Sequence, residues 1–568
     1  MSRTTSYPQT MPPTRPEVSS TGPEAEKRAR WSQLASSADH KDIGRILVTA
    51  SFGSLFLAAL ELLLLRLQLA VPSNVFLEGV TFDRLLSVYG ETAIFLIALP
   101  LAIGLLYYVV PLQIGARTTA IPRVGQIGLW LFMVGGVLLY ASFLFTPPEA
   151  GINPLPPFSD ATFNPNNGVD VWITSTGMIT LGLLLVSIDL LATLHNLRAP
   201  GMAWRRAPLF TWAAAIVTWL FTVIAPIFLA AITMLMIDRL YDGGFFAGSA
   251  GGSPVLWQHL SYIFFTGVYM IVSVTFLAAI GEIVQTFTGR ELPRKSVTRS
   301  LVAIAVIGTL AWTQNMLTVP MDSGWKYYGM LMSLALIVPF GLIFYNLITT
   351  VSESDFHMRA PLRFALGALS LASIGLAAEI AQSTIAVATQ LSETYDAWAA
   401  THFALVGFAV FGGFAAVSYW YPKMTGRQLN EDRAMKSFGL MFIGALVAIL
   451  PLFAAGVAGQ VTDSYRWFSG EDFGVYNAIS AVGTLILFVG IVLAVGNLVK
   501  SRTEEPAATP DPYRGDSLEW LALSPPPAHN FDVLPDVRST RPMRDIREAI
   551  TRRDAESAEA ESAAQPVA

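Results

Sequence analysis

Long apolar stretches alternate with short polar segments along most of this chain. A membrane helix needs about 20 apolar residues, and twelve stretches reach that length. Their approximate bounds are 44–70, 85–112, 124–146, 170–194, 210–236, 256–286, 299–318, 327–350, 361–388, 397–421, 436–459 and 477–499. The pattern predicts an all-α, polytopic membrane protein built as a bundle of twelve transmembrane helices.

The two ends of the chain differ from the middle. Residues 1–40 are polar and rich in Pro, Ser and Thr, while residues 503–568 are rich in Pro, Ala, Glu and Arg. Such segments bury too little apolar surface to order themselves. We therefore expect a disordered cytoplasmic tail over 1–40, a twelve-helix domain over 41–502 and a second disordered cytoplasmic tail over 503–568. The first tail has no apolar core of the signal-peptide type, so the first span is expected to direct insertion.

Composition supports the membrane assignment and excludes several chemistries. The chain is 53% hydrophobic and 14% charged, whereas soluble proteins are about 25% charged. The lipid bilayer is thus the first expected partner, and no nucleic acid is expected. The absence of cysteine rules out disulfides, iron–sulfur clusters and thiolate metal sites.

Basic residues indicate the orientation of the bundle. If the N-terminus is cytoplasmic, the outer loops hold Arg84, Arg239, Lys326 and Arg466. The inner loops hold many more: Arg117, Arg123, Arg198, Arg205, Arg206, Arg290, Arg294, Lys295, Arg299, Arg359, Arg363, Lys423, Arg427, Arg433 and Lys436. Because cytoplasmic loops carry an excess of Lys and Arg, we expect both termini in the cytoplasm and the protein in a prokaryotic cell (inner) membrane.

A few polar groups fall inside the predicted spans. They are Glu61, Arg66, Tyr89, Glu91, Asp189, Glu379 and His402. Such groups are costly in lipid and usually face a bundle interior. His402 lies in AWAATHFALVGF (397–408), in a chain with six histidines. An imidazole there can donate to a backbone carbonyl of a neighbouring helix or bind a metal, and the residues alone leave both options open.

Several motifs occur together and in order. They are SADHKDIGRI (37–46), LRLQLAVPSN (65–74), VTFDRLLSVYG (80–90), YVVPLQIGARTTAIPR (108–123), LRAPGMAWRRAPLFTW (197–212), AAITMLMIDR (230–239), PVLWQHL (254–260), NMLTVPMD (315–322) and YWYPKMTGR (419–427). Over roughly residues 37–500 the chain resembles subunit I of the heme–copper oxidases, in the cytochrome c oxidase branch. The resemblance implies a twelve-helix bundle, in agreement with the twelve apolar stretches.

The resemblance also implies six metal-binding histidines, two for a low-spin haem, one for a high-spin haem and three for copper. The first low-spin position falls at Tyr89, one copper position at Thr266, and the copper pair at Gln314 and Asn315. Neutral amides do not replace imidazole as copper ligands. The tyrosine that the family joins to a copper histidine falls at Met270, or at Tyr269 if a deletion is allowed.

The tenth span would carry the last two histidines. The high-spin position falls at Ala400 and the second low-spin position at His402, so His402 is the one ligand that the resemblance retains. Arg66 matches an arginine that contacts the low-spin haem, and His259 also persists. Other family positions hold different residues: Thr118, Val268 and Ile343 for the proton channels, Thr462 and Asp463 for the haem-propionate arginines, and Ser392 and Glu393 for a magnesium or manganese site.

These substitutions lead to our first hypothesis. The chain is a cytochrome c oxidase subunit I homologue that has lost its oxygen-reduction site and serves as a redox-silent structural or regulatory subunit of a respiratory complex. On this hypothesis it has no catalytic residues, is not an enzyme by itself, binds no copper and no haem, and its partners are other respiratory membrane subunits.

Three alternatives stay open. A single-haem electron-transfer subunit would hold one low-spin haem between Tyr89 and His402, near Arg66. Tyrosinate can bind haem iron, although a carboxylate at Glu91 would raise the cost of forming it. A catalytically competent terminal oxidase subunit is a further alternative. Protons or ions could also pass by Glu61, Asp189 and Glu379, for which hydrogen bonding between helices is the simpler explanation; whether Glu91 carries a proton is open too.

Overall fold

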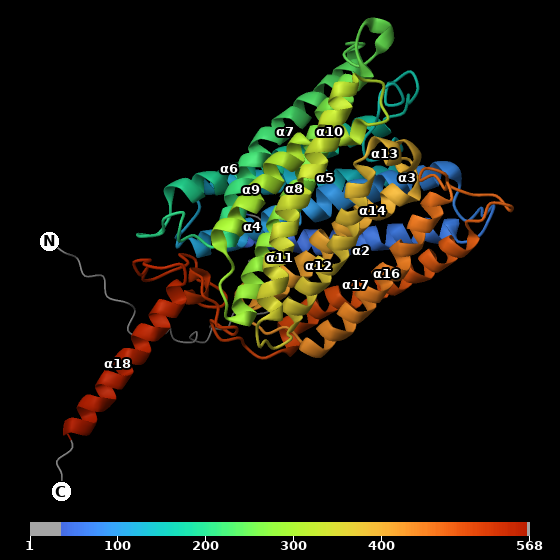
Figure 1. Ribbon diagram of the computed structural model, residues 1–568. Coiled ribbons are helices and arrows are strands. Elements are labelled where there is room, and N and C mark those ends of the chain that lie inside the picture. Colours follow the sequence, from blue (N-terminus) through green and yellow to red (C-terminus); the bar gives the residue numbers. More distant parts are fainter. Residues whose placement is uncertain (1–35, 565–568) are drawn as a thin grey trace, which may run out of the picture.

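The computed structural model describes residues 36–564, which form a helical bundle (Figure 1) with no β-strand among them. The tail prediction for residues 1–35 lies outside the described residues. Twelve helical stretches in the described part are long and apolar enough to cross a membrane. The predictions of an all-α fold and of twelve spans are therefore confirmed, and the chain is a multi-pass membrane protein.

The spans follow one another in chain order. They are α2 (His40–Leu69); α3 (Gly79–Glu91) with η1 (Thr92–Ala98) and α4 (Leu99–Gln113); α5 (Pro122–Ala141) with η2 (Ser142–Leu144); α6 (Gly168–Asn196); α7 (Leu209–Tyr241); α8 (Pro254–Thr288); α9 (Arg294–Leu310) with η4 (Trp312–Met316); α10 (Ser323–Ala335) with α11 (Ile337–Ser352); α12 (Ala360–Gln382); α14 (Tyr395–Leu405) with η5 (Val406–Phe411) and α15 (Gly412–Thr425); α16 (Glu431–Val457); and α17 (Gly474–Glu504). Outside them lie η3 (Gly248–Ala250), α13 (Ile385–Leu391), η6 (Leu518–Leu521) and α18 (Pro542–Ala564).

Spans 2, 6 and 10 form the core of the bundle. The most apolar window of span 2 is 100% buried inside the protein, and those of spans 6 and 10 are 83% and 72% buried, against 33% for spans 3 and 8. Helices that are apolar on all sides pack at the centre, because no face needs to meet water. Tyr89, Thr266 and His402 belong to these central spans.

Two of the central spans contain a π-helical segment. Span 2 continues through η1 directly after Glu91, and span 10 continues through η5 a few residues after His402. A π-turn holds one residue more than an α-turn, and such turns are frequent at functional sites. Both segments adjoin the polar residues that the sequence singles out.

Glycines allow the last two spans to pack closely. A Cβ atom at Gly483 of α17 would lie 2.2 Å from the backbone nitrogen of Ala448, and one at Gly444 of α16 would lie 2.4 Å from that of Leu487. Small residues at such contacts let helix backbones approach in a membrane protein. The pair α16–α17 is therefore fixed by backbone contact.

The C-terminal tail differs from the expectation of disorder over 503–568. Leu518, Trp520 and Met543 are fully buried against the bundle, and Phe531 is nearly so. The expectation considered the tail's own composition, which cannot form a core alone. The bundle supplies the missing surface, so a few apolar residues suffice to dock the segment.

The docked tail crosses one end of the bundle, which we call the tail face. The tail face is formed by the loops 114–121, 197–208, 289–293 and 426–430. Asn530 accepts from the Lys41 ammonium at 2.7 Å and donates to the Ala116 carbonyl at 2.8 Å. Val537 N–H donates to the Pro200 carbonyl at 3.0 Å. The tail therefore bonds to the start of span 1 and to loops from distant parts of the sequence.

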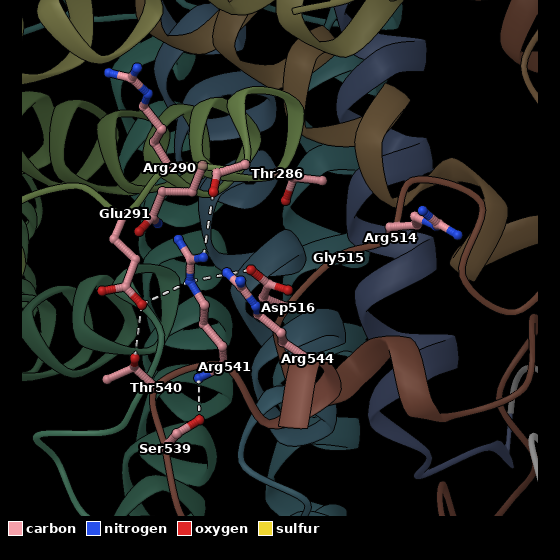
Figure 2. Close-up of polar contacts among 12 residues, drawn as sticks. Thr286, Arg290, Glu291, Arg514, Gly515, Asp516, Ser539, Thr540, Arg541 and Arg544 are labelled. Atoms are coloured by element: carbon pink, nitrogen blue, oxygen red, sulfur yellow. Dashed lines mark hydrogen bonds and ion pairs between the residues drawn. The ribbon is translucent and has the colours of Figure 1, made fainter. Parts of the chain in front are cut away.

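Figure 2 shows a second part of this docking, where Arg541 points between two carboxylates. Its guanidinium lies 2.8 Å from Glu291, which follows span 6, and 3.3 Å from Asp516 of the tail. Arg290 and Arg514 point away from this cluster in the same view. Beyond it, α18 projects from the bundle (Figure 1).

Candidate functional site

His402 and Tyr89 are in direct contact at the centre of the bundle. The Tyr89 hydroxyl lies 2.8 Å from His402 Nε2, and His402 Nδ1 lies 2.8 Å from the Trp398 carbonyl oxygen. The carbonyl can only accept, so Nδ1 carries the proton and Nε2 accepts from the tyrosine. In this neutral form of the imidazole both nitrogens are engaged.

Aromatic rings and a guanidinium enclose the imidazole. The Trp398 ring stacks on that of His402, with centroids 3.2 Å apart. On α2, the Arg66 guanidinium carbon lies 4.3 Å from the Trp398 ring and 4.5 Å from the Tyr395 ring, in cation–π geometry. The structure therefore brings Arg66, Tyr89 and His402 to one place, as the resemblance implied, and adds Trp398. A tryptophan four residues before His402 is the sequence signal for this contact, since i and i+4 share a helix face.

A haem does not fit between Tyr89 and His402 in this arrangement. Two axial ligands of one iron lie on opposite sides of the metal with bonds near 2 Å, so their donor atoms are about 4 Å apart. Here the oxygen and nitrogen are 2.8 Å apart and bonded to each other. The adjoining apolar cavity, lined by Leu55, Ala93, His402 and Leu487 among others, measures about 60 Å³, against roughly 300–1,000 Å³ for ligand pockets.

A larger cavity of about 300 Å³ surrounds the positions to which the resemblance assigns copper. Thr266, Gln314 and Asn315 line it, as does Glu379. The Asn315 amide donates to the Thr266 hydroxyl at 3.0 Å, and the Ser333 hydroxyl donates to the Gln314 carbonyl oxygen at 2.6 Å. The three positions thus gather in space, with hydroxyl and amide groups bonded between spans.

Ala400 is fully buried and offers a methyl group at the high-spin position. The next residue, Thr401, donates its hydroxyl to Glu379 at 2.8 Å, which links span 10 to span 9. Between residues 36 and 557, no three His, Cys, Asp or Glu side chains gather in a way that could hold a metal ion.

The carboxylates of the proposed ion path lie in three separate sets. Asp189 accepts from the Tyr107 hydroxyl at 2.5 Å and from the Ile121 N–H at 2.6 Å. Glu61 accepts from the Tyr140 hydroxyl at 3.1 Å, and Glu379 bonds to Thr401. Hydrogen bonds between helices account for these contacts.

Sequence reasoning missed Glu519, a fully buried carboxyl in η6 of the tail. One of its oxygens accepts from Ser517 at 2.9 Å and from Gln113 and Trp420 at 3.2 Å each. Burial raises the pKa of the Glu519 carboxyl above its usual range. No signal in the tail's composition pointed to this residue, because its partners come from spans 2 and 10.

Comparison with known proteins places the chain among respiratory oxidase subunits. Residues 42–486 match the family described as "Cytochrome C and Quinol oxidase polypeptide I". The chain is 31% identical to "Cytochrome c oxidase subunit 1" of Bacillus subtilis over 525 residues, which cover 91% of this chain and 84% of that protein. It is 32% identical to the subunit of the same name from Corynebacterium glutamicum over 538 residues, covering 93% and 91%.

Similarity extends to quinol oxidases and to a solved structure. The chain is 30% identical to "Quinol oxidase subunit 1" of Bacillus subtilis over 514 residues, covering 90% of this chain and 79% of that protein. Its fold matches a chain of a heme–copper terminal oxidase dimer solved by cryo-EM, with a TM-score of 0.68 and 14% identity over 83% of this chain and 85% of that one. By its sequence and its fold, the chain belongs to the cytochrome c and quinol oxidase polypeptide I family, the subunit I family of the heme–copper oxidases.

Proposed function

We propose that this chain is a redox-silent subunit I homologue that serves as a structural or regulatory subunit of a respiratory membrane complex. The observation that carries the proposal is the state of His402, whose two nitrogens bond to Tyr89 and Trp398. The one imidazole that the resemblance retains has no free nitrogen for a metal.

Hydrogen bonds join the spans at the positions where the family resemblance implies metal bonds. Tyr89 and His402 connect span 2 to span 10. Asn315 connects span 7 to Thr266 of span 6, and Gln314 connects it to Ser333 of span 8. Each such bond contributes about 0.6–2 kcal/mol in a membrane protein. The scaffold is thus stabilised from within by its own side chains, and a stable scaffold is what a structural subunit needs.

The names of the relatives favour an oxidase, and the single-haem alternative needs Tyr89 and His402 as axial ligands. Both activities require ligand atoms that bind a metal. In this chain the relevant positions hold a methyl group, two amides and a hydroxyl, and the remaining histidine and tyrosine bind each other. These contacts support the redox-silent function over both alternatives.

Optical and metal measurements on the purified full-length chain test the proposal. We expect no haem bands in the reduced-minus-oxidised spectrum, no copper in stoichiometric amount, and no difference between the wild type and His402→Ala in the visible region. Membranes from the same host without the gene serve as the control. One haem per chain, or oxygen uptake by the purified chain, contradicts the proposal.

A second experiment tests the role in a complex. Affinity purification from mild detergent is expected to recover other respiratory membrane subunits with the chain. A variant tagged on the same tail but carrying Gly483→Ala, which separates α16 from α17, should recover less of them. Purification of the chain alone in several mild detergents would refute the subunit role.

A further inference from the structure

A groove of about 800 Å³ runs between α9 of span 7 and the helices α10 and α11 of span 8. Both spans lie toward the outside of the bundle, since only 44% and 33% of their most apolar windows are buried inside the protein. On α11, Val338 and Leu342 line the groove and are 64% and 45% exposed. The groove is therefore open to the surroundings of the bundle, which at this depth are lipid.

The two ends of the groove differ in polarity. At the tail face, where α9 begins, the groove is lined by Arg294, Lys295 and Arg299. Farther along, the lining residues are apolar, with Ala303, Ile307, Val338 and Leu342 among them. The lining positions 295, 299, 303 and 307 are four residues apart, so the basic part and the apolar part lie on one face of α9.

The basic end of the groove has no acidic counterpart in the protein. No Asp or Glu of the described chain lines the groove. Two carboxylates stand close to it in sequence, one before α9 and one after α11, and both are engaged elsewhere. Glu291 pairs with Arg541 at 2.8 Å, and Glu353 pairs with Arg290 at 3.1 Å. Neither carboxylate is free to balance the basic lining residues.

Two of the three basic residues keep their charge unbalanced. Glu282 of α8 lies within electrostatic reach of Arg294, so this guanidinium is offset in part. Lys295 and Arg299 are exposed at the groove. Lys295 belongs to the first turn of α9, where the helix dipole is itself positive and acidic residues are favoured, yet this turn has none. The place is therefore one at which an anion is stabilised.

We propose that this groove binds one anionic phospholipid, with its phosphate at Lys295 and Arg299 and an acyl chain along the apolar part. Lys and Arg are the side chains that bind phosphate, and basic pockets between membrane helices hold anionic lipid head groups. Basic residues are common at this end of the bundle because they set its orientation; these two differ because they lead directly into an apolar groove. The site lies outside the central spans and does not depend on the redox-silent function.

Quenching by brominated lipids tests the site in the full-length chain. The chain has no cysteine, so Leu342→Cys can carry a single bimane fluorophore at the groove. Leu493→Cys on α17, where the native leucine is likewise 45% exposed, carries the control label. Each labelled chain is reconstituted into phosphatidylcholine vesicles that contain either brominated phosphatidylglycerol or brominated phosphatidylcholine in the same proportion.

The label at position 342 should be quenched more strongly by phosphatidylglycerol, with an association constant about 5- to 30-fold higher than for phosphatidylcholine. Each basic contact to an anionic lipid raises the constant by about fivefold. Lys295→Gln with Arg299→Gln should abolish the preference. Lys436→Gln with Lys500→Gln, which removes the same charge from exposed residues of α16 and α17, is the matched control and should keep it.

Equal quenching by the two lipids at position 342 overturns the proposal, as does an equal preference at position 493 or one that survives the double substitution at 295 and 299. Ala303→Phe fills the groove without a change of charge and should also reduce quenching by phosphatidylglycerol; if the double variant does not fold, unchanged quenching in Ala303→Phe overturns the proposal. Inorganic phosphate is compared with sodium chloride of equal ionic strength. Loss of the preference with phosphate alone would assign the site to a soluble phosphate compound and overturn the lipid.

Discussion

His402 bonds to two groups of the protein itself at a position where the family resemblance implies a haem ligand. Its Nε2 faces Tyr89 across the gap between spans 2 and 10, and its Nδ1 faces its own helix at Trp398. A neutral imidazole has one donor and one acceptor, and this environment uses both. The residue therefore acts as a cross-link between spans.

Removing the donor of this cross-link should destabilise the bundle. Tyr89→Phe leaves His402 Nε2 buried and unpaired, which costs about 1–3 kcal/mol. We expect a lower midpoint of thermal unfolding in detergent, followed by tryptophan fluorescence. Tyr345→Phe, at a tyrosine that is 66% exposed, is the matched control and should leave the midpoint unchanged; an equal midpoint for Tyr89→Phe would show that the bond contributes nothing.

The sequence could predict which residues share this site but not how they meet. The resemblance placed Arg66, Tyr89 and His402 around one position, and the structure brings all three there. It could not show that Tyr89 and His402 would bond to each other, because that depends on the distance between two spans. The sequence also could not predict that both carboxylate oxygens of Glu91 lack a hydrogen-bond partner, since pairing depends on residues of α2 and α5.

At the scale of helices, hydropathy predicted how many spans the chain has, but it did not predict where a helix breaks or becomes π-helical. Lipid requires long apolar runs with satisfied backbones, so all twelve spans could be found. The ninth was expected over 361–388, but α12 ends at Gln382 and α13 starts at Ile385. Apolar residues continue across this break and across the π-helical segments η1 and η5. Hydropathy cannot locate these features because it does not depend on which backbone groups are hydrogen-bonded to each other.

The close pair α16–α17 gives a prediction at this scale. Gly483→Ala places a methyl group against the Ala448 backbone and should cost about 1–3 kcal/mol by overpacking, seen as a lower unfolding midpoint. Gly496→Ala, on the same helix with no atom within 4 Å of its added Cβ, should be neutral or stabilising by about 0.5–1 kcal/mol, since alanine favours helices. Equal effects of the two variants would refute backbone contact as the cause.

The short element η6 should make tail docking depend on pH. Because burial raises the pKa of Glu519 above its usual 4.5, the docked tail binds this proton more tightly than the undocked tail. The contribution of Glu519 to docking is therefore fully present at pH values below 4.5 and is lost as the pH rises from 4.5 through the raised value. Hydrogen–deuterium exchange of residues 511–531, corrected for intrinsic rates, should show faster opening along that rise.

Glu519→Gln should remove most of this pH dependence, because the amide keeps an oxygen for Ser517, Gln113 and Trp420 and cannot ionise. Glu548→Gln, at an exposed carboxylate of α18 that pairs with Arg544, is the matched control and should leave the dependence intact. Exchange that slows with rising pH would contradict the assigned role of Glu519.

At the scale of the whole molecule, the distribution of basic loops predicts both ends on the cytoplasmic side. The chain has no cysteine, so single cysteines report sidedness without interference. Ser557→Cys on α18 should resist a membrane-impermeant maleimide in intact cells and react after lysis. Ser469→Cys, in the loop between α16 and α17, should react in intact cells; the reverse pattern would invert the topology.

The docked tail has a consequence for the order in which the molecule is made. Asn530 bonds to Lys41 at the beginning of the first span, and Val537 bonds to the loop after the fourth, yet both residues are made only after all twelve spans. Until then, these early loops lack the partners they have in the finished protein. Synthesis of the segment after residue 511, rather than insertion of any one helix, thus joins the early and late parts of the bundle, and a ribosome stalled before that segment would leave an intermediate without these contacts, exposed to membrane proteases.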